Sequence, residues 1–105
     1  MTVGNEKNMT ETGIDARVLE EIRQLAEKYG VHKVILFGSR ARGDFKRASD
    51  IDLAVSGGDM AGFALDVDEE TWTLLKYDVV NLDRAVQPEL LESINREGIL
   101  LYEKV

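Results

Sequence analysis

Two spacings of apolar residues alternate along the chain and predict alternating helices and strands. Between residues 15 and 29 the apolar positions recur every three or four residues, the period of an amphipathic helix: Val18, Leu19, Ile22, Leu25, Ala26 and Tyr29. Asp15 suits the N-terminal cap of this helix, and Gly30 suits the left-handed residue after its end. The next segment, "HKVILF" at 32–37, is rich in β-branched and aromatic residues and stops at a glycine, so it predicts a strand.

The same alternation continues to the C-terminal end of the chain. "DIDLAV" at 50–55 and "YDVVNL" at 77–82 predict a second and a third strand, and "ILLY" at 99–102 predicts a fourth. The apolar residues within 60–75 predict a helix that carries Trp72. Pro88 suits the first turn of a last helix, which Gly98 would end.

This order of elements predicts the fold class. Helices that alternate with strands indicate a sheet covered by helices, so we expect an α+β domain with α/β alternation along the chain. A chain of 105 residues is near the common size of one domain. The polar, aperiodic residues 1–13 predict a flexible leader, and residues 14–105 form the single predicted domain.

Composition narrows the class of protein further. An apolar fraction of 44% and a charged fraction of 31% are typical of a soluble globular domain. No apolar run approaches the roughly 20 residues of a membrane helix, and no secretory signal pattern is visible. The absence of cysteine suits a reducing compartment, so we expect a cytoplasmic protein that contacts no membrane.

Charge is distributed unevenly along the chain. The formal net charge of −7 argues against a nucleic-acid binder that works by bulk electrostatics. One segment is locally basic nevertheless, and it contains Arg40, Arg42, Lys46 and Arg47. A basic island in an acidic chain predicts one small anion site. The alternative is a solvated surface loop.

The basic island follows a glycine turn. "VILFGSRARGDF" at 34–45 has the glycine spacing of a Walker A phosphate loop, but Asp44 and Phe45 stand where that loop needs Lys and then Ser or Thr. Gly38 still allows the backbone to approach a phosphate, and Ser39 can donate its hydroxyl and amide at a helix N-terminus. Nearby arginines would then supply the charge of the missing lysine.

Two aspartates mark the strand that follows. Side chains alternate across a strand, so Asp50 and Asp52 project to one face while Ile51, Leu53 and Val55 point into a core. Two neighbouring carboxylates repel each other, and a shared Mg²⁺ or Mn²⁺ would relieve that repulsion. By itself, an Asp-x-Asp on a strand is more typical of a polar face turned to solvent than of a metal site.

The third predicted strand contributes another carboxylate. Asp78 interrupts "KYDVVNL" where an apolar residue would be expected. If this strand lies beside the second, Asp78 can join Asp50 and Asp52 around a pair of metal ions, which can hold the attacking and leaving oxygens of a phosphoryl transfer. The alternative is a charge at the edge of a strand.

These features together resemble a known family. "GSRARGDFKRASDIDLAV" resembles the signature of the polymerase-β-like nucleotidyltransferase superfamily, in which Gly-Ser is followed after a spacer by Asp-x-Asp. "YDVVNL" is similar to the strand that carries the third carboxylate, and "INREGILLYE" is similar to the closing helix and strand. The resemblance covers roughly residues 15–103 and is closest to the minimal nucleotidyltransferases, small domains usually encoded beside a HEPN-domain protein.

The resemblance implies a mixed sheet packed with helices and a role for each motif residue. It implies that Gly38 and Ser39 bind the β- and γ-phosphates of the nucleotide. It makes Asp50 and Asp52 ligands of two Mg²⁺ ions, with Mn²⁺ as a substitute, and Asp78 a ligand of the ion that activates the incoming hydroxyl. Where the family's third strand often carries a further acid, this chain has an asparagine at position 81.

Three functions follow as hypotheses. The leading one is a nucleotidyltransferase that moves AMP from ATP to a hydroxyl, with the resemblance implying a tyrosine of a partner HEPN toxin and an antitoxin role. The second is a binding module that only occludes a HEPN ribonuclease, which the acidic charge would suit. The third is a small-molecule nucleotidyltransferase of the aminoglycoside-modifying type. Because the predicted helices are all needed to cover the sheet, we expect a helical partner or a second copy to complete the acceptor site.

Two other residues were weighed for chemistry. His32 is the only histidine and stands in a chain without cysteine, so a zinc site is not indicated and a structural or surface role is expected. Trp72 is expected in the core or at an interface, with stacking on a base as the weaker alternative.

Overall fold

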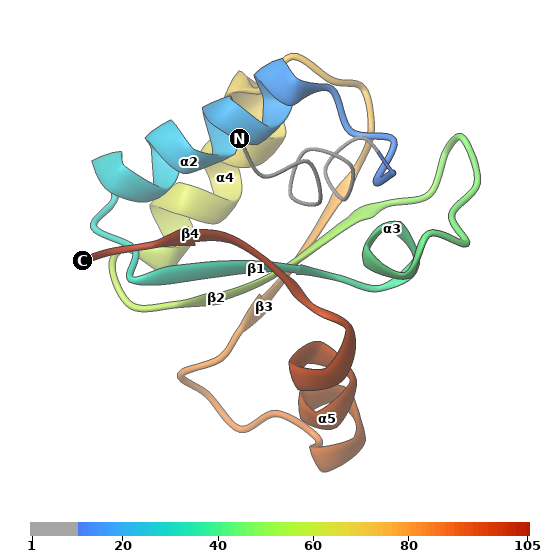
Figure 1. Ribbon diagram of the computed structural model, residues 1–105. Helices are drawn as coiled ribbons and strands as arrows, with labels where there is room; N and C mark the ends of the chain where they lie inside the picture. The colour runs from blue at the N-terminus through green and yellow to red at the C-terminus, as the bar shows by residue number, and fades with distance from the viewer. Residues whose placement is uncertain (1–10) are drawn as a thin grey trace.

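The computed structural model describes residues 11–105 and shows one four-stranded sheet with helices on both faces (Figure 1). The elements in chain order are α2 (Ala16–Lys28), β1 (Lys33–Phe37), α3 (Ser39–Arg42), β2 (Ile51–Ser56), α4 (Met60–Glu70), β3 (Tyr77–Asn81), α5 (Pro88–Glu97) and β4 (Ile99–Glu103). Most of the predicted leader, residues 1–10, lies outside the described residues. Its last three residues form a turn in which Thr12 is buried.

The sheet is mixed, as the resemblance implies. Its strands lie in the order β3-β2-β1-β4. β1 pairs antiparallel with β2 and with β4, whereas β2 and β3 run parallel. A parallel pair needs a crossover, and α4 provides it. The α+β fold class is therefore confirmed.

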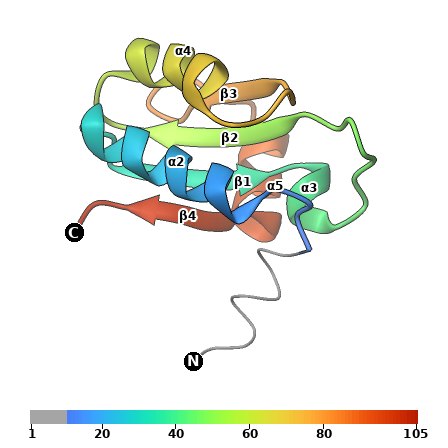
Figure 2. The same cartoon turned by 90° about the horizontal axis from the view of Figure 1, so that it is seen from above.

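Three layers result, with helices divided unequally between the two faces. α2 and α4 lie side by side on one face, and α5 lies on the other (Figures 1 and 2). The larger core lies under α2 and α4 and includes Ile22, Leu36, Ile51, Leu53 and Phe63. A smaller cluster lies under α5 and contains Phe37, Ala54 and Ile94. Ile51, Leu53 and Val55 therefore point into the larger core, as predicted. Because side chains alternate along β2, Asp52 and Ala54 face the side of the sheet that α5 covers.

Local signals set the ends of α2. The Asp15 carboxylate accepts a hydrogen bond of 2.8 Å from the backbone N–H of Arg17, which satisfies one of the free donors of the first turn. At the other end, Gly30 takes the left-handed conformation at φ 68°. Both predicted signals are confirmed. The turn at Gly30 leads the chain from the end of α2 into β1.

The helix predicted over 60–75 ends earlier than expected. α4 stops at Glu70, and Thr71 is extended with φ −91° and ψ 151°. The last turn carries carboxylates and no basic residue, so their negative charge lies unfavourably at the negative end of the helix dipole. The Thr71 hydroxyl also donates to the carbonyl of Val67 at 2.6 Å. The placement of Trp72 on a helix was therefore wrong: it lies in the segment 71–76 that leads to β3, and its side chain is 69% exposed, outside the core.

Arg40 is the most unusual member of the interior. Its side chain is only 2% exposed. The three guanidinium nitrogens donate to the carbonyls of Ser49, Thr12 and Arg47 at 3.0, 2.9 and 3.2 Å, and the group lies 4.8 Å from the ring centre of Phe45. Arg40 thus fastens both the connection 43–50 and the segment before α2 to the end of the sheet.

Replacing Arg40 with Ala leaves these carbonyls without a donor in a buried place. We expect the free energy of unfolding to fall by about 2–4 kcal/mol, because an unsatisfied buried polar group costs far more than a hydrogen bond gains. Urea unfolding followed by circular dichroism measures the change. Arg47→Ala is the matched control, since that side chain is exposed; equal stability of the Arg40 variant and this control would contradict the assignment.

Candidate active site

Asp52 and Asp78 lie next to each other on neighbouring strands. The parallel register of β2 and β3 pairs Asp52 with Asp78. Asp52 is half-buried, Asp78 is exposed, and Asp50 lies exposed just before β2 begins. The condition set by the sequence, that the third strand lies beside the second, is met. All three carboxylates therefore belong to the same end of the sheet.

The environment of Asp52 disfavours its charged form. Burial, followed by the charges of Asp78 and Asp50, raises the pKa of Asp52 from 3.8 to about 6. Arg42 and Arg40 oppose this rise but do not cancel it. The carboxylate is thus held in a place where it repels its neighbours and is incompletely solvated. Such stored repulsion is typical of functional sites.

The donor set suits a hard divalent cation. Within residues 11–105, no three acidic or histidine side chains already converge closely enough to hold a metal ion. Mg²⁺ or Mn²⁺, which prefer oxygen ligands, would draw these three neighbouring carboxylates together. Asp50, Asp52 and Asp78 therefore fit the cation by chemistry, and its binding would remove the repulsion that Asp52 experiences.

The glycine turn packs directly against Asp52. Gly38 has φ 76° and precedes the single turn of α3. A Cβ atom built on Gly38 would overlap the Asp52 carboxylate, so only glycine fits here. Ser39 follows at once, and its hydroxyl has no hydrogen-bond partner among residues 11–105. The turn proposed for phosphate and the carboxylates proposed for metal are therefore one site.

Of the two arginines predicted to bind nucleotide, the structure gives Arg40 a different place. Its guanidinium points away from solvent and is committed to backbone carbonyls. Burial lowers its pKa, an effect that the charge of Asp52 opposes. We therefore do not retain Arg40 as a phosphate ligand. Sequence alone does not distinguish the two arginines, because Arg40 and Arg42 are two residues apart in the same basic segment.

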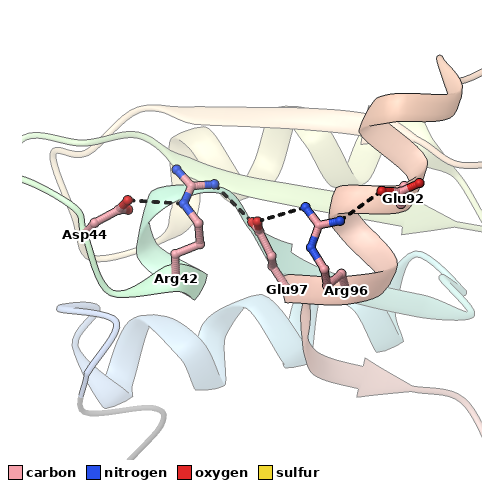
Figure 3. A network of polar contacts seen from close by, with 5 residues as sticks. All are labelled: Arg42, Asp44, Glu92, Arg96 and Glu97. Carbon is pink, nitrogen blue, oxygen red and sulfur yellow. Dashed lines mark hydrogen bonds and ion pairs between the residues drawn. The ribbon is translucent and has the colours of Figure 1, made fainter.

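Arg42 is exposed and stands at the edge of the site (Figure 3). Its Nη1 lies 3.1 Å from Oε2 of Glu97 and its Nε lies 3.3 Å from Oδ2 of Asp44. Glu97 in turn contacts Arg96 at 3.6 Å. These contacts, the bond to Glu97 first, raise the pKa of Arg42. Arg42 therefore keeps its charge beside Asp52, and it links α3 to α5 on the same face of the sheet.

Glu97 is a site-border residue that the sequence did not indicate. It lies 55 positions from Arg42 in the chain, in a segment that reads only as the end of a helix. The contact arises because α5 packs over the face of the sheet that carries Asp52. No local pattern could have predicted it.

Comparison with known proteins identifies the class. Residues 20–105 match the family described as polymerase beta, nucleotidyltransferase. A protein of Methanocaldococcus jannaschii, provisionally named a protein adenylyltransferase, is 43% identical over 97 residues, which cover 81% of this chain and 94% of that protein. The chain belongs to the polymerase β nucleotidyltransferase family, and it is a nucleotidyltransferase.

Solved structures support the same fold. A toxin–antitoxin crystal structure with AMP-PNP superposes with a TM-score of 0.67 at 24% identity, covering 82% of this chain and 73% of that chain. A mutant of the toxin–antitoxin MntA–HpeT gives 0.66 at 22% identity, with the same coverage of 82% and 73%. At this identity the likeness shows the fold. Among residues 11–105, no helix is long and apolar enough to cross a bilayer.

A pair of glycine variants tests whether the turn and Asp52 form one site. Gly38→Ala and Gly43→Ala both force a side chain into a positive φ, at 76° and 94°. Only the Gly38 variant brings a Cβ against Asp52, since a Cβ on Gly43 meets nothing within 4 Å. We expect Gly38→Ala to weaken Mg²⁺–ATP binding by about 100-fold, because displacing a positioned group by about 1 Å has effects of this size. Calorimetric titration measures it; an equal loss in both variants would mean that backbone strain alone matters.

The raised pKa of Asp52 predicts how stability depends on pH without metal. The folded state binds the Asp52 proton more tightly than the unfolded state, so the free energy of unfolding falls as pH rises from about 4 to about 7. Asp52→Asn should remove this fall and stabilise the metal-free protein at pH 8 by on the order of 1 kcal/mol after solvent screening. Urea unfolding in EDTA at pH 4.5 and pH 8 measures it, with the exposed Asp68→Asn as control. A pH dependence that survives in Asp52→Asn contradicts the assignment.

Proposed function

We propose that this nucleotidyltransferase transfers AMP from Mg²⁺–ATP to a hydroxyl group of a partner protein. The observation that carries the proposal is the pairing of Asp52 with Asp78 directly beside the Gly38 turn. A phosphate turn next to clustered carboxylates suits a reaction in which metal ions and phosphates must be held together. The relative from Methanocaldococcus jannaschii, which the chain matches over 94% of its length, supports transfer of an adenylyl group to protein.

The nucleotide would lie across the turn and the carboxylates. Gly38 and Ser39 would hold the β- and γ-phosphates through the backbone amide and the Ser39 hydroxyl at the start of α3. Arg42, on the last residue of α3, would add a positive charge after exchanging Glu97 or Asp44 for a phosphate oxygen. Exchange is feasible because its side chain is 43% exposed. Lys46, exposed in the connection 43–50, can contribute from solvent.

The carboxylates would position the reacting atoms. Asp50 and Asp52 would hold two Mg²⁺ ions and Asp78 one of them; when bound, these ions neutralise charge on the α-phosphate and lower the pKa of the attacking hydroxyl. The acceptor oxygen then forms a bond to the α-phosphorus as the bond from that phosphorus to the bridging oxygen of pyrophosphate breaks. The hydroxyl proton passes to the Asp78 carboxylate, which is exposed and can return it to water. AMP-protein and pyrophosphate are the products.

A HEPN-domain toxin is the acceptor that we propose, through a tyrosine hydroxyl. The solved structures that share this fold include toxin–antitoxin complexes, one of them with AMP-PNP. The chain would then act as the antitoxin, and modification of the toxin would be its means of neutralisation. An open acceptor side suits this role, because Asp78 is exposed on the edge strand β3 and a protein hydroxyl can reach it.

The decisive variants are Asp50→Asn and Asp52→Asn, made together. With α-³²P-labelled ATP and Mg²⁺, the wild-type chain should label the toxin on tyrosine, and the double variant should lose at least about 1,000-fold of that rate, since it removes metal charge from the transition state. Glu103→Gln, which changes an exposed carboxylate on β4 at the opposite edge of the sheet, is the control.

Toxicity in cells separates catalysis from occlusion. If catalysis matters, the double variant fails to protect cells that express the toxin even though it still binds the toxin. Full protection by the double variant would show that binding suffices. Absence of label on the toxin with the wild-type chain, under Mg²⁺ and Mn²⁺ alike, would contradict the proposed acceptor.

A further inference from the structure

Three large apolar side chains stand exposed near one another on α4 and the segment that follows it. Leu65 is 57% exposed, Trp72 is 69% exposed and Leu74 is fully exposed. Two grooves flank them: one of about 630 Å³ is lined by Trp72 and Leu74, and one of about 660 Å³ is lined by Leu65. Both grooves share Asp68, so the three side chains belong to one surface. We refer to Leu65, Trp72 and Leu74 as the Trp72 surface.

Trp72 is held in place although it is exposed. Its backbone N–H donates to Oε1 of Glu21 on α2 at 2.7 Å. The Arg17 guanidinium lies 4.6 Å from the centre of its ring, and Arg17 also contacts Glu21 at 3.7 Å. An exposed tryptophan fixed by a neighbouring element is typical of an anchor residue at a protein interface, because little conformational freedom is lost on binding.

The Trp72 surface lies at the catalytic end of the sheet. The segment 71–76 runs directly into β3, where Asp78 stands. The carbonyl of Lys76 accepts a hydrogen bond of 2.8 Å from the N–H of Ile51, the residue between Asp50 and Asp52. A macromolecule seated on Trp72 and Leu74 would therefore lie next to the strand ends that carry the carboxylates.

The charge around the surface selects its occupant. Asp68 and Glu69 line the groove beside Trp72, and Glu70 is exposed next to them, whereas Lys76 is the single basic residue among 11–105 that lines either groove. A second copy of the chain would bring like charges together, and a nucleic acid or an anionic membrane would be repelled for the same reason. A protein that presents an apolar cleft rimmed by lysine and arginine is complementary in both respects.

We infer that the Trp72 surface is the docking site of the protein acceptor, which binds it through a basic, apolar-lined cleft and thereby presents its hydroxyl to the Asp52–Asp78 site. This inference rests on the proposed function. It assigns acceptor recognition to Leu65, Trp72, Leu74 and the carboxylates of α4, and it assigns nucleotide binding to the turn at Gly38.

The test uses the HEPN-domain toxin proposed above as the acceptor for the probe, and calorimetry as the readout. Trp72→Ala combined with Leu74→Ser should weaken binding of that protein by about 30-fold or more, the size of effect found for anchor residues. The same variant should keep wild-type affinity for Mg²⁺–ATP. Leu100→Ser is the matched control, because Leu100 is 50% exposed but lies on β4 at the opposite edge of the sheet. Thermal melts check that both variants fold.

A charge variant tests the inference independently of the apolar anchors. Asp68→Lys combined with Glu69→Lys should also weaken the complex, and the wild-type affinity should fall as salt rises. Unchanged partner affinity in the variant Trp72→Ala with Leu74→Ser overturns the inference, and so does an equal loss of partner affinity in Leu100→Ser. A loss of ATP affinity in the Trp72 variant also overturns it, because Trp72 would then be a base-stacking residue. A wild-type chain that does not bind the partner overturns it as well. A wild-type chain that binds the partner without labelling it refutes the proposed reaction and leaves the docking result readable from affinity alone.

Discussion

The parallel pairing of β2 with β3 is the constraint on which the site depends. The register sets Asp52 opposite Asp78. The backbone hydrogen bonds between the two strands therefore keep the two carboxylates side by side, and the strands cannot move apart to reduce the repulsion. The core on the other face of the sheet, with Ile51 and Leu53 fully buried, resists any shift of that register. Packing thus holds together charges that would separate in a flexible chain. The raised pKa of Asp52 is the electrostatic consequence.

β1, which lies on the other side of β2 from β3, leads into the glycine turn of the site. Gly38 directly follows β1 and packs against Asp52, so the turn and the carboxylates form one unit. The larger core, under α2 and α4, supports both strands. Arg40 and Arg42 then divide two tasks that look identical in the sequence. Arg40 anchors the connection between β1 and β2, and Arg42 remains at the surface with a charge available beside Asp52. Two residues along a helix rotate the side-chain direction by about 200°, which sends the two arginines of α3 in opposite directions.

Much of this could be predicted from the sequence, because the signals were local. The alternation of "IDLAVS" indicated which residues of β2 face the core, Asp15 and Gly30 indicated the ends of α2, and the glycine turn with Asp-x-Asp indicated the class of enzyme. The features that sequence reasoning missed depend on contacts between distant segments. Glu97 reaches Arg42 only because α5 packs on the sheet, and the end of α4 at Glu70 reflects an unfavourable last turn that apolar spacing does not report. Trp72 was placed on a helix because apolar spacing does not show that α4 ends at Glu70.

We propose above that the clustered carboxylates form a divalent-cation site for the nucleotide. Electron paramagnetic resonance of Mn²⁺, titrated into the protein with the unreactive analogue α,β-methylene-ATP, tests it without an acceptor. We expect two Mn²⁺ ions to bind per chain in the presence of the analogue. Tight binding should be lost in Asp52→Asn, whereas Asp68→Asn should behave like the wild type. The same number of Mn²⁺ ions bound with the same affinity in the wild type and in Asp52→Asn would contradict it.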